Sequence, residues 1–281
     1  MKKFTKIILI ISLVLVVIGN MMYWGAKLYK FFSDDYDTTV GSRAFEISEA
    51  FDSIDINAQY ANVQILPGDT CTCTMDNVEL DVSDVYVSDY TLHVVAKNKE
   101  NMNIFGWNIG NIVDGGEPSK IILHVPIPYE KLVVSSSQLI ENGMDTAGVV
   151  KIHGIKADIG SGRFDCSTLI TDKLVIQLGA GELKCGYLAV ADKGAIQMGI
   201  GRTGIEMLEC EDVTVKNGIG AIDIGITGDL ERYDIKVADS VGRVYIAGLT
   251  KTGLNIDTTK RGTGEKLLEL ETGAGTIRVR Q

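Results

Sequence analysis

Apolar and polar positions alternate along most of this chain, and the alternation recurs in blocks of about 20 residues. Each block is centred on a Gly-x-Gly triplet. The copies are Gly160–Gly162, Gly179–Gly181, Gly199–Gly201, Gly218–Gly220 and Gly273–Gly275, with a degenerate copy at Ser240–Gly242. The second glycines at 162, 181, 201 and 220 are 19, 20 and 19 residues apart, and the step to Gly242 is 22. A fixed period near 20 is typical of a solenoid.

The alternation changes parity at each triplet. Apolar residues lie five positions before the second glycine and two and four positions after it, as Val215, Ile222 and Ile224 do around Gly220. A slip of one residue turns a strand inside out, so the chain must turn or bulge at the triplet if both flanking strands are to face one interior. Glycine suits such a corner because it adopts positive φ and has no Cβ to meet the next rung. We therefore predict an all-β parallel β-helix, or β-solenoid, with ~20-residue coils and rungs about 4.8 Å apart.

The same offsets appear earlier, in Phe51–Leu66, so the repetitive domain is expected to occupy residues 49–281. Two segments break the period, Asn98–Ser119 and Lys251–Lys266, and both are predicted to be loops that project from the stack. Insertions of this kind in solenoids often carry binding function. Two stacked sheets in place of a closed helix remain an alternative, although the period favours the solenoid.

A membrane anchor is predicted at the N-terminus. From Ile7 to Ala26 there is no charged residue, a length sufficient to cross a hydrocarbon core of about 30 Å as a helix. Lys2, Lys3 and Lys6 precede it, which places the N-terminus in the cytoplasm. Cleavage as a signal peptide is the competing interpretation, but Trp24–Ala26 is a poor cleavage site because Trp is not small.

We therefore expect a cytoplasmic stub and signal anchor at 1–30, an acidic spacer at 31–48 and an extracytoplasmic domain at 49–281. The net charge of the chain is −10, but residues 1–30 hold five lysines and no acid. The rest carries 27 − 5 = 22 bases against 37 acids, a net charge of −15. Such a domain repels nucleic acid, so no nucleic-acid partner is expected.

Several of these segments together resemble a known family. They are the opening Phe-Asp-Ser-Ile-Asp-Ile-Asn-Ala from Phe51, Ala61–Leu66, the strand end Ile122–Pro126 and the serial Gly-x-Gly rungs. Over about Phe51 to Gln281 the chain resembles the bacterial putative adhesin family, which comprises membrane-anchored β-helical domains of unknown function associated with the cell envelope. The resemblance implies fold and location, and it supplies no catalytic residues.

The loop that contains Phe105, Trp107 and Ile109 is the best candidate for a binding site. An exposed aromatic side chain can stack on a sugar ring or anchor a protein contact. The alternative is that the loop folds back and covers the apolar end of the stack, which every solenoid must close.

Other motifs point to structure more than to chemistry. Gly199–Gly204 matches G-x-G-x-x-G, but a strand-like segment follows where a dinucleotide site needs a helix. The histidines, His93, His124 and His153, have no metal-ligand spacing. Cys71 and Cys73 share a strand face and could bind a metal or be redox active.

Cys166 and Cys185 occupy equivalent interior positions, so a stacked disulfide is an alternative to two packed thiols. The acids Glu209, Glu211 and Asp212 could suggest glycoside chemistry or Ca²⁺ binding, but an acidic domain forms such clusters by chance.

The sequence thus predicts a membrane-anchored extracytoplasmic binding or scaffolding module, adhesin-like or part of a cell-envelope stress response. Its expected partners are the membrane, through residues 7–26, and an envelope protein or glycan. It is not expected to be an enzyme, and no cofactor is implied. The alternative functions are a carbohydrate-active β-helix enzyme and a purely structural spacer.

Overall fold

The structure is a computed structural model that describes residues 39–98, 103–104, 107–108, 117–126 and 149–281 except 247. Residues Val40–Gln281 form one compact unit, separate from Met1–Thr39. Within the described residues the fold is all-β, and the helical structure is a single 3-10 turn, η2 (Leu230–Arg232). No helix in this part of the chain is long and apolar enough to cross a membrane. The predicted anchor at 7–26 lies outside the described residues.

The described residues form the strands β1 to β12. In chain order they are β1 (Val40–Ile47), β2 (Ser53–Gly68), β3 (Cys71–Glu79), β4 (Asp84–Ser88), β5 (Thr91–Ala96), β6 (Asn103–Ile104), β7 (Trp107–Asn108), β8 (Ser119–Pro126), β9 (Val149–Ile226), β10 (Tyr233–Ile246), β11 (Leu249–Lys260) and β12 (Lys266–Arg280). All but β6 and β7 belong to one continuous hydrogen-bonded sheet.

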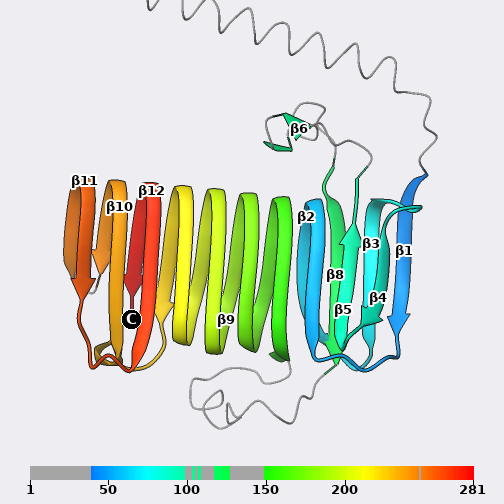
Figure 1. Ribbon diagram of the computed structural model, residues 1–281, viewed down its shortest axis with the longest axis horizontal. Coiled ribbons are helices and arrows are strands. Elements are labelled where there is room, and N and C mark those ends of the chain that lie inside the picture. The colour runs from blue at the N-terminus through cyan, green and yellow to red at the C-terminus, as the bar shows by residue number, and fades with distance from the viewer. Residues whose placement is uncertain (1–38, 99–102, 105–106, 109–116, 127–148, 247) are drawn as a thin grey trace, which may run out of the picture. The chain divides into compact units, whose positions relative to one another are not determined.

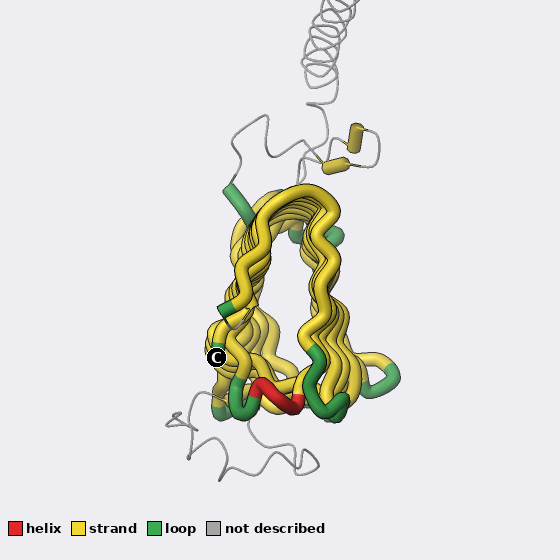
Figure 2. The backbone as a smooth tube through the Cα atoms, turned by 90° about the vertical axis from the view of Figure 1, so that its left-hand side faces the viewer, coloured by secondary structure: helices red, strands yellow, loops and turns green. Residues whose placement is uncertain are grey.

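The backbone of β9 winds through several stacked coils (Figure 1). Each coil runs along one side, over an arch and back along the other side (Figure 2). Neighbouring coils pair in parallel and in register, as Val63 of β2 does with Phe164 of β9 and Ile222 of β9 with Ile277 of β12. The positions predicted to face inward are buried, among them Ile222 and Ile224. The predicted change of parity at each triplet is therefore confirmed.

The glycine triplets form the arch. The second glycines have positive φ, +129° at Gly162 and +137° at Gly220. A Cβ on Gly162 would overlap the carbonyl oxygen of Ala61 in the neighbouring coil, and the same relation joins Gly181 to Gly162 and Gly220 to Gly201. Both predicted reasons for glycine, its φ and its missing Cβ, are confirmed at these positions.

The coils do not stack in the order of the chain. After β9 the chain passes η2, forms β10 and β11, and returns as β12, which lies between β9 and β10 in the sheet. Gly275 of β12 is paired with Gly220 on one side and with Gly242 of β10 on the other. The simple solenoid expected from the period, with one coil after the next, therefore ends in an inserted strand.

The prediction that Lys251–Lys266 form a projecting loop is wrong. Most of this segment is β11, an antiparallel partner of β10 along its whole length. The segment is polar because β11 is the last strand of the stack and is largely exposed. Its polar sequence therefore resembles that of a loop. A strand that covers an end does not need the alternation of an interior coil.

Both ends of the stack are covered by antiparallel strands. At one end β1 pairs with β3, although Val40–Ile47 fall within the segment predicted as a spacer. At the other end Lys251 of β11 is paired with Val244, and its Nζ donates to Thr258 Oγ1 at 2.9 Å. Lys260 Nζ similarly donates to the Leu230 carbonyl at 3.2 Å. Lysines facing the end of the core oppose the addition of a further strand.

Candidate functional site

The loop predicted as a binding site is described only in part. Trp107 begins β7, which pairs antiparallel with β6 through Ile104 and Trp107. Phe105 and Ile109 lie outside the described residues. The binding role of Phe105, Trp107 and Ile109 therefore stays a prediction. A capping role is not required of this loop, because β1 and β11 cover the ends of the stack.

The three histidines lie apart, each with its own neighbour. His93 stacks on Tyr86 with ring centroids 5.0 Å apart, and His153 Nδ1 lies 2.6 Å from Asp172 Oδ2. His124 Nδ1 lies 3.3 Å from Thr72 Oγ1. Among the described residues no three His, Cys, Asp or Glu side chains are grouped so that they could hold a metal ion.

The five cysteines are buried, and none is joined in a disulfide in this structure. In β3, burial raises the pKa of Cys71 to about 11 and that of Cys73 to about 12, so both are neutral thiols near pH 7. Cys166 and Cys185 face each other on adjacent coils with their Sγ atoms 2.6 Å apart. Desolvation raises the pKa of Cys185 well above its ordinary value, and Cys166 reinforces this. A thiol that stays protonated is a poor nucleophile and metal ligand.

The predicted acid cluster is divided between structural contacts. Glu209 accepts a hydrogen bond from the Tyr187 hydroxyl at 3.0 Å. The buried Lys266 ammonium lies 3.5 Å from Glu209 and 3.4 Å from Glu211. Asp212 lies 3.6 Å from Lys193 on the surface. Glu209 and Glu211 hold the start of β12 against β9 through Lys266, whereas Asp212 pairs with Lys193 within β9.

The G-x-G-x-x-G motif at Gly199–Gly204 lies wholly within β9. Its first three residues form one of the arches, and strand continues beyond Gly204. A dinucleotide site would need a helix to begin here. The motif is therefore a consequence of the repeat.

A different surface stands out by its charge. Residues 243–281 contain seven bases, Arg243, Lys251, Lys260, Arg261, Lys266, Arg278 and Arg280, and four acids, Asp257, Glu265, Glu269 and Glu271. This gives 7 − 4 = +3, whereas the rest of the chain carries (27 − 7) − (37 − 4) = −13. The chain from Arg243 onward is thus basic on an otherwise acidic protein.

Two arginines of this region, Arg278 and Arg280, gather with Arg202 of β9 around one carboxylate. Arg280 Nε donates to Asp223 Oδ1 at 3.1 Å, and Asp223 Oδ2 lies 3.6 Å from Arg202 Nη2 and 3.7 Å from Arg278 Nη1. The Asp223 side chain is only 16% exposed, while the arginine side chains are more than half exposed. One carboxylate cannot neutralise three guanidinium groups, so the cluster is left with a positive charge.

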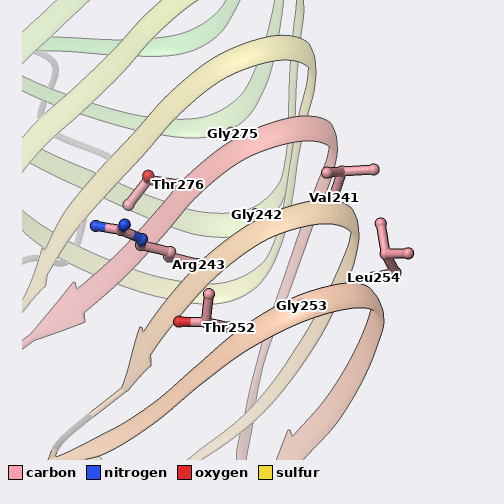
Figure 3. Close-up of a pocket in the computed structure, with 8 residues that line it drawn as sticks. All are labelled: Val241, Gly242, Arg243, Thr252, Gly253, Leu254, Gly275 and Thr276. Carbon is pink, nitrogen blue, oxygen red and sulfur yellow. The ribbon is translucent and has the colours of Figure 1, made fainter.

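Arg243 extends this positive surface across β10. Its partners in register are Thr276 of β12 and Thr252 of β11. Together with Val241, Gly242, Gly253, Leu254 and Gly275 they line a shallow pocket of about 450 Å³. Arg243, Thr252 and Thr276 lie on one side of the arch glycines, and Val241 and Leu254 lie on the other (Figure 3). We call Arg202, Arg243, Arg278 and Arg280 the arginine face.

The crest of the arch beside the arginine face is apolar. It consists of Ile200, Ile219, Val241 and Leu254, which are 42%, 55%, 50% and 74% exposed. Val241 and Leu254 are paired in register. We call these four residues the arch ridge. The small Ala274, the middle residue of the β12 triplet, lies between Ile219 and Val241. At the equivalent positions of earlier coils stand Ser161 and Ala180.

Sequence reasoning missed both surfaces because it followed the inward positions of the repeat. A signal was present: the middle residue of the triplet changes from Ser161 and Ala180 to Ile200, Ile219 and Val241 along the chain. An apolar side chain that points outward at a turn does not contribute to the core, so it suggests a contact with another molecule. The clustering of the arginines was not accessible in the same way, because it depends on the insertion of β12 beside β9.

Comparison with known proteins gives distant structural similarity. No family model matches the chain, and no curated protein matches it either. Among solved structures it is similar to a putative cell adhesion protein from Clostridium sporogenes, with 13% identity, a TM-score of 0.39 and coverage of 86% of this chain and 100% of the other. A putative adhesin from Bacteroides fragilis has 13% identity, a TM-score of 0.29 and coverage of 86% and 98%. A putative adhesin from Parabacteroides merdae has 12% identity, a TM-score of 0.27 and coverage of 87% and 98%.

The solved structures similar to this chain are thus described as bacterial putative adhesins, which is the family that the sequence resembles. Similarity at this distance leaves the function to be argued from the residues of the chain itself.

Proposed function

We propose that this protein is a membrane-anchored β-solenoid that works as an adhesin-like binding module outside the cytoplasmic membrane. The observation that carries the proposal is the arch ridge beside the arginine face, near the end of the stack formed by β10, β11 and β12. Its partner is a component of the cell envelope, a protein or a glycan. The module has no catalytic role in this proposal.

The composition of this surface supports a binding role. The centre of an interface is more apolar than its rim, and arginine is enriched there, so exposed apolar side chains next to arginines fit a binding surface. Leu254 is the most exposed member of the arch ridge. Ile219 and Ile200 continue the ridge onto β9.

The strands that cover both ends of the stack support partner binding on its sides. Lys251 and Lys260 oppose the addition of a strand to β11, and β1 covers the opposite end. A stack closed in this way does not extend by coil-to-coil assembly. Contacts with a partner are therefore expected on its sides and arches, where the ridge lies.

The anchor and the resemblance support the location. The uncharged segment at 7–26, preceded by lysines, favours an N-terminus in the cytoplasm and a domain outside it. Fusions of a phosphatase that is active only outside the cytoplasm, placed after residue 281, test this orientation. An inactive fusion at normal expression would contradict the proposed location.

Photo-crosslinking in intact cells tests the binding role. A photoreactive residue is placed at position 254 on the arch ridge, at position 107 in the predicted loop, or at the exposed position 177 on the side of the stack. We expect a discrete adduct from position 254 that is absent at 177. An adduct from 107 alone would move the site to the Phe105–Ile109 loop, and adducts from neither position would refute a stable partner at either surface.

A further inference from the structure

We infer that the arginine face binds a linear polyanion, a polymer whose carboxylate or phosphate groups repeat along its length, laid across the coils in the stacking direction. This inference rests on the proposed function, since it names the ligand of the same surface. It concerns Arg202, Arg243, Arg278 and Arg280 together with the hydroxyls of Thr252 and Thr276.

The register places these arginines on three of four consecutive coils: Arg202 on β9, Arg278 and Arg280 together on β12, and Arg243 on β10, with Asp223 on the coil between Arg202 and β12. Arg278 pairs with Asp223 in the last coil of β9, one coil beyond Arg202, and Arg243 follows on β10. Rungs of a stacked sheet are about 4.8 Å apart. The arginine face therefore extends over four coils, roughly 14 Å along the stack. A row of this length fits several charges of one extended polymer better than a single small anion.

Guanidinium groups suit this ligand. Each is permanently charged, is weakly hydrated and offers paired N–H donors that match a carboxylate or phosphate. Asp223 engages Arg202, Arg278 and Arg280 at 3.1 to 3.7 Å and so restricts their positions. Asp223 is thus a positioning residue that holds guanidinium groups toward one surface while their remaining donors stay open to solvent.

The balance of charge here differs from that of other ion pairs on the stack. Lys216 lies 2.7 Å from Glu271, Lys236 lies 2.9 Å from Glu269, and Arg163 lies 2.7 Å from Glu182, so each of these cations has a carboxylate close by. In the arginine face three cations share Asp223, and Arg243 forms no ion pair with a described residue. The four arginines and Asp223 carry 4 − 1 = +3. Arg278 also lies over the Tyr245 ring of β10, 5.6 Å from its centroid, but no second carboxylate of the described residues balances this excess charge.

The acidity of the whole protein does not prevent such binding. The screening length is about 10 Å at 0.1 M salt, so a polymer on the arginine face senses mainly the nearby charges. Thr252 and Thr276 add hydroxyl donors in the pocket beside Arg243, and the arch ridge adds apolar contact for the polymer backbone.

Two probes distinguish the sources of the anion. Full-length protein in detergent micelles is titrated with polygalacturonate, a polycarboxylate, and with inorganic polyphosphate, at several NaCl concentrations. We expect at least one to bind, and the tighter one identifies the carboxylate or phosphate class. Arg243→Gln and Arg278→Gln should each weaken binding about tenfold and lower the slope of log K against log salt by about one.

The matched control is Lys236→Gln, which removes one positive charge from the same strand, β10. Lys236 precedes the arch glycine Gly242, whereas Arg243 follows it. Lys236→Gln should change affinity less than about twofold. Asp223→Asn separates positioning from bulk charge. Asp223→Asn raises the net positive charge of the arginine face, so simple attraction predicts tighter binding. Loss of positioning predicts weaker binding instead. It also predicts that Arg278→Gln weakens binding by less than tenfold when it is added to Asp223→Asn.

The inference is overturned if neither polymer binds, if Lys236→Gln weakens binding as much as Arg243→Gln, or if Asp223→Asn binds more tightly than the wild type. Equally tight binding of inorganic monophosphate would show that no repeating polymer is needed and would also overturn it. If Asp223→Asn fails to fold, the comparison of Arg243→Gln with Lys236→Gln still tests whether the arginine face binds the polymer. A crosslink from position 254 that survives Arg243→Gln would leave the proposed function standing while the polyanion assignment fails.

Discussion

Gly220 lies directly against Gly201 of the neighbouring coil, and a Cβ on Gly220 would overlap the Gly201 carbonyl oxygen. The same residue has a φ of +137°, which side-chain-bearing residues rarely adopt. The arch is therefore a column of backbone-to-backbone contacts, and each glycine supports the next coil. Loss of one glycine should separate two coils at the arch and strain both.

Gly220→Ala should accordingly destabilise the fold by about 3 kcal/mol, the sum of backbone strain and overpacking. The measurement is the free energy of unfolding in denaturant. The control is Gly204→Ala, earlier in β9. At Gly204 φ is not positive, and the nearest atom to an added Cβ is Leu183 O at 3.8 Å. The control should change stability by less than about 0.5 kcal/mol. Equal losses in both variants would contradict the account of the arch.

Ile222→Asp should unfold the domain. Ile222 is 1% exposed in the core, and an unpaired carboxylate there would be desolvated, at a cost of several kcal/mol. Thermal unfolding followed by circular dichroism measures the effect. Ile219→Asp is the matched control, because Ile219 lies three residues earlier on the exposed arch ridge, and its melting temperature should stay near that of the wild type. An unchanged melting temperature for Ile222→Asp would refute the inward assignment.

Alkaline pH should destabilise the protein through its buried thiols. Burial raises the pKa of Cys73 and Cys210 to about 12 from an ordinary value of 9.0. Below pH 9 the thiols are protonated in both states, so their contribution to stability is fully present. Between pH 9 and 12 only the unfolded state ionises, and the free energy of unfolding should fall by about 1.4 kcal/mol per thiol for each pH unit.

Denaturation midpoints at pH 7, 8.5 and 10 test this expectation. They should agree at pH 7 and 8.5 and fall at pH 10. Cys73→Ala removes one raised pKa, so its midpoint should fall less steeply with pH even if its stability at pH 7 is lower. A wild-type midpoint that falls between pH 7 and 8.5, or an identical slope in Cys73→Ala, would show that other groups govern the alkaline limit.

The double variant Lys251→Val and Lys260→Val should self-associate. These lysines face the end of the core from β11, and valine would leave an apolar edge strand open to pairing with another copy. The weight-average mass in sedimentation should rise with concentration above that of the wild type. Lys216→Val with Lys236→Val removes the same charge from the sides of the stack and should not associate. Association in the control alone would point to net charge as the cause.

The sequence predicted the local structure of the coils well, for a physical reason. Alternation and the parity change at each triplet are set by side chains within a few residues, so Val215, Ile222 and Gly220 reveal the arch without any knowledge of neighbours. Burial and φ confirm these positions. The ends of the stack follow different rules, because β1 and β11 lie at the edge, where polar residues are tolerated.

The order of the coils could not be predicted in this way. The residues around Gly242 and Gly275 obey the same pattern, so either coil satisfies the pairing that Gly220 offers. Their order depends on contacts between distant segments, such as Lys266 with Glu209 and Arg280 with Asp223. The arginine face exists only because of that order, and for this reason it was not foreseen.

The place of β12 also bears on how the chain is made. Synthesis proceeds from the N-terminus, so β10 and β11 are made before the 15 residues of β12 that must separate β10 from β9. Because β10 and β12 share one register, we expect an early contact between β9 and β10 that has to open again before β12 can enter. Completion of the last coils is then coupled to delivery of the C-terminus. A chain that stops short would keep unpaired strand edges open to proteolysis, so the fold itself distinguishes finished chains from unfinished ones.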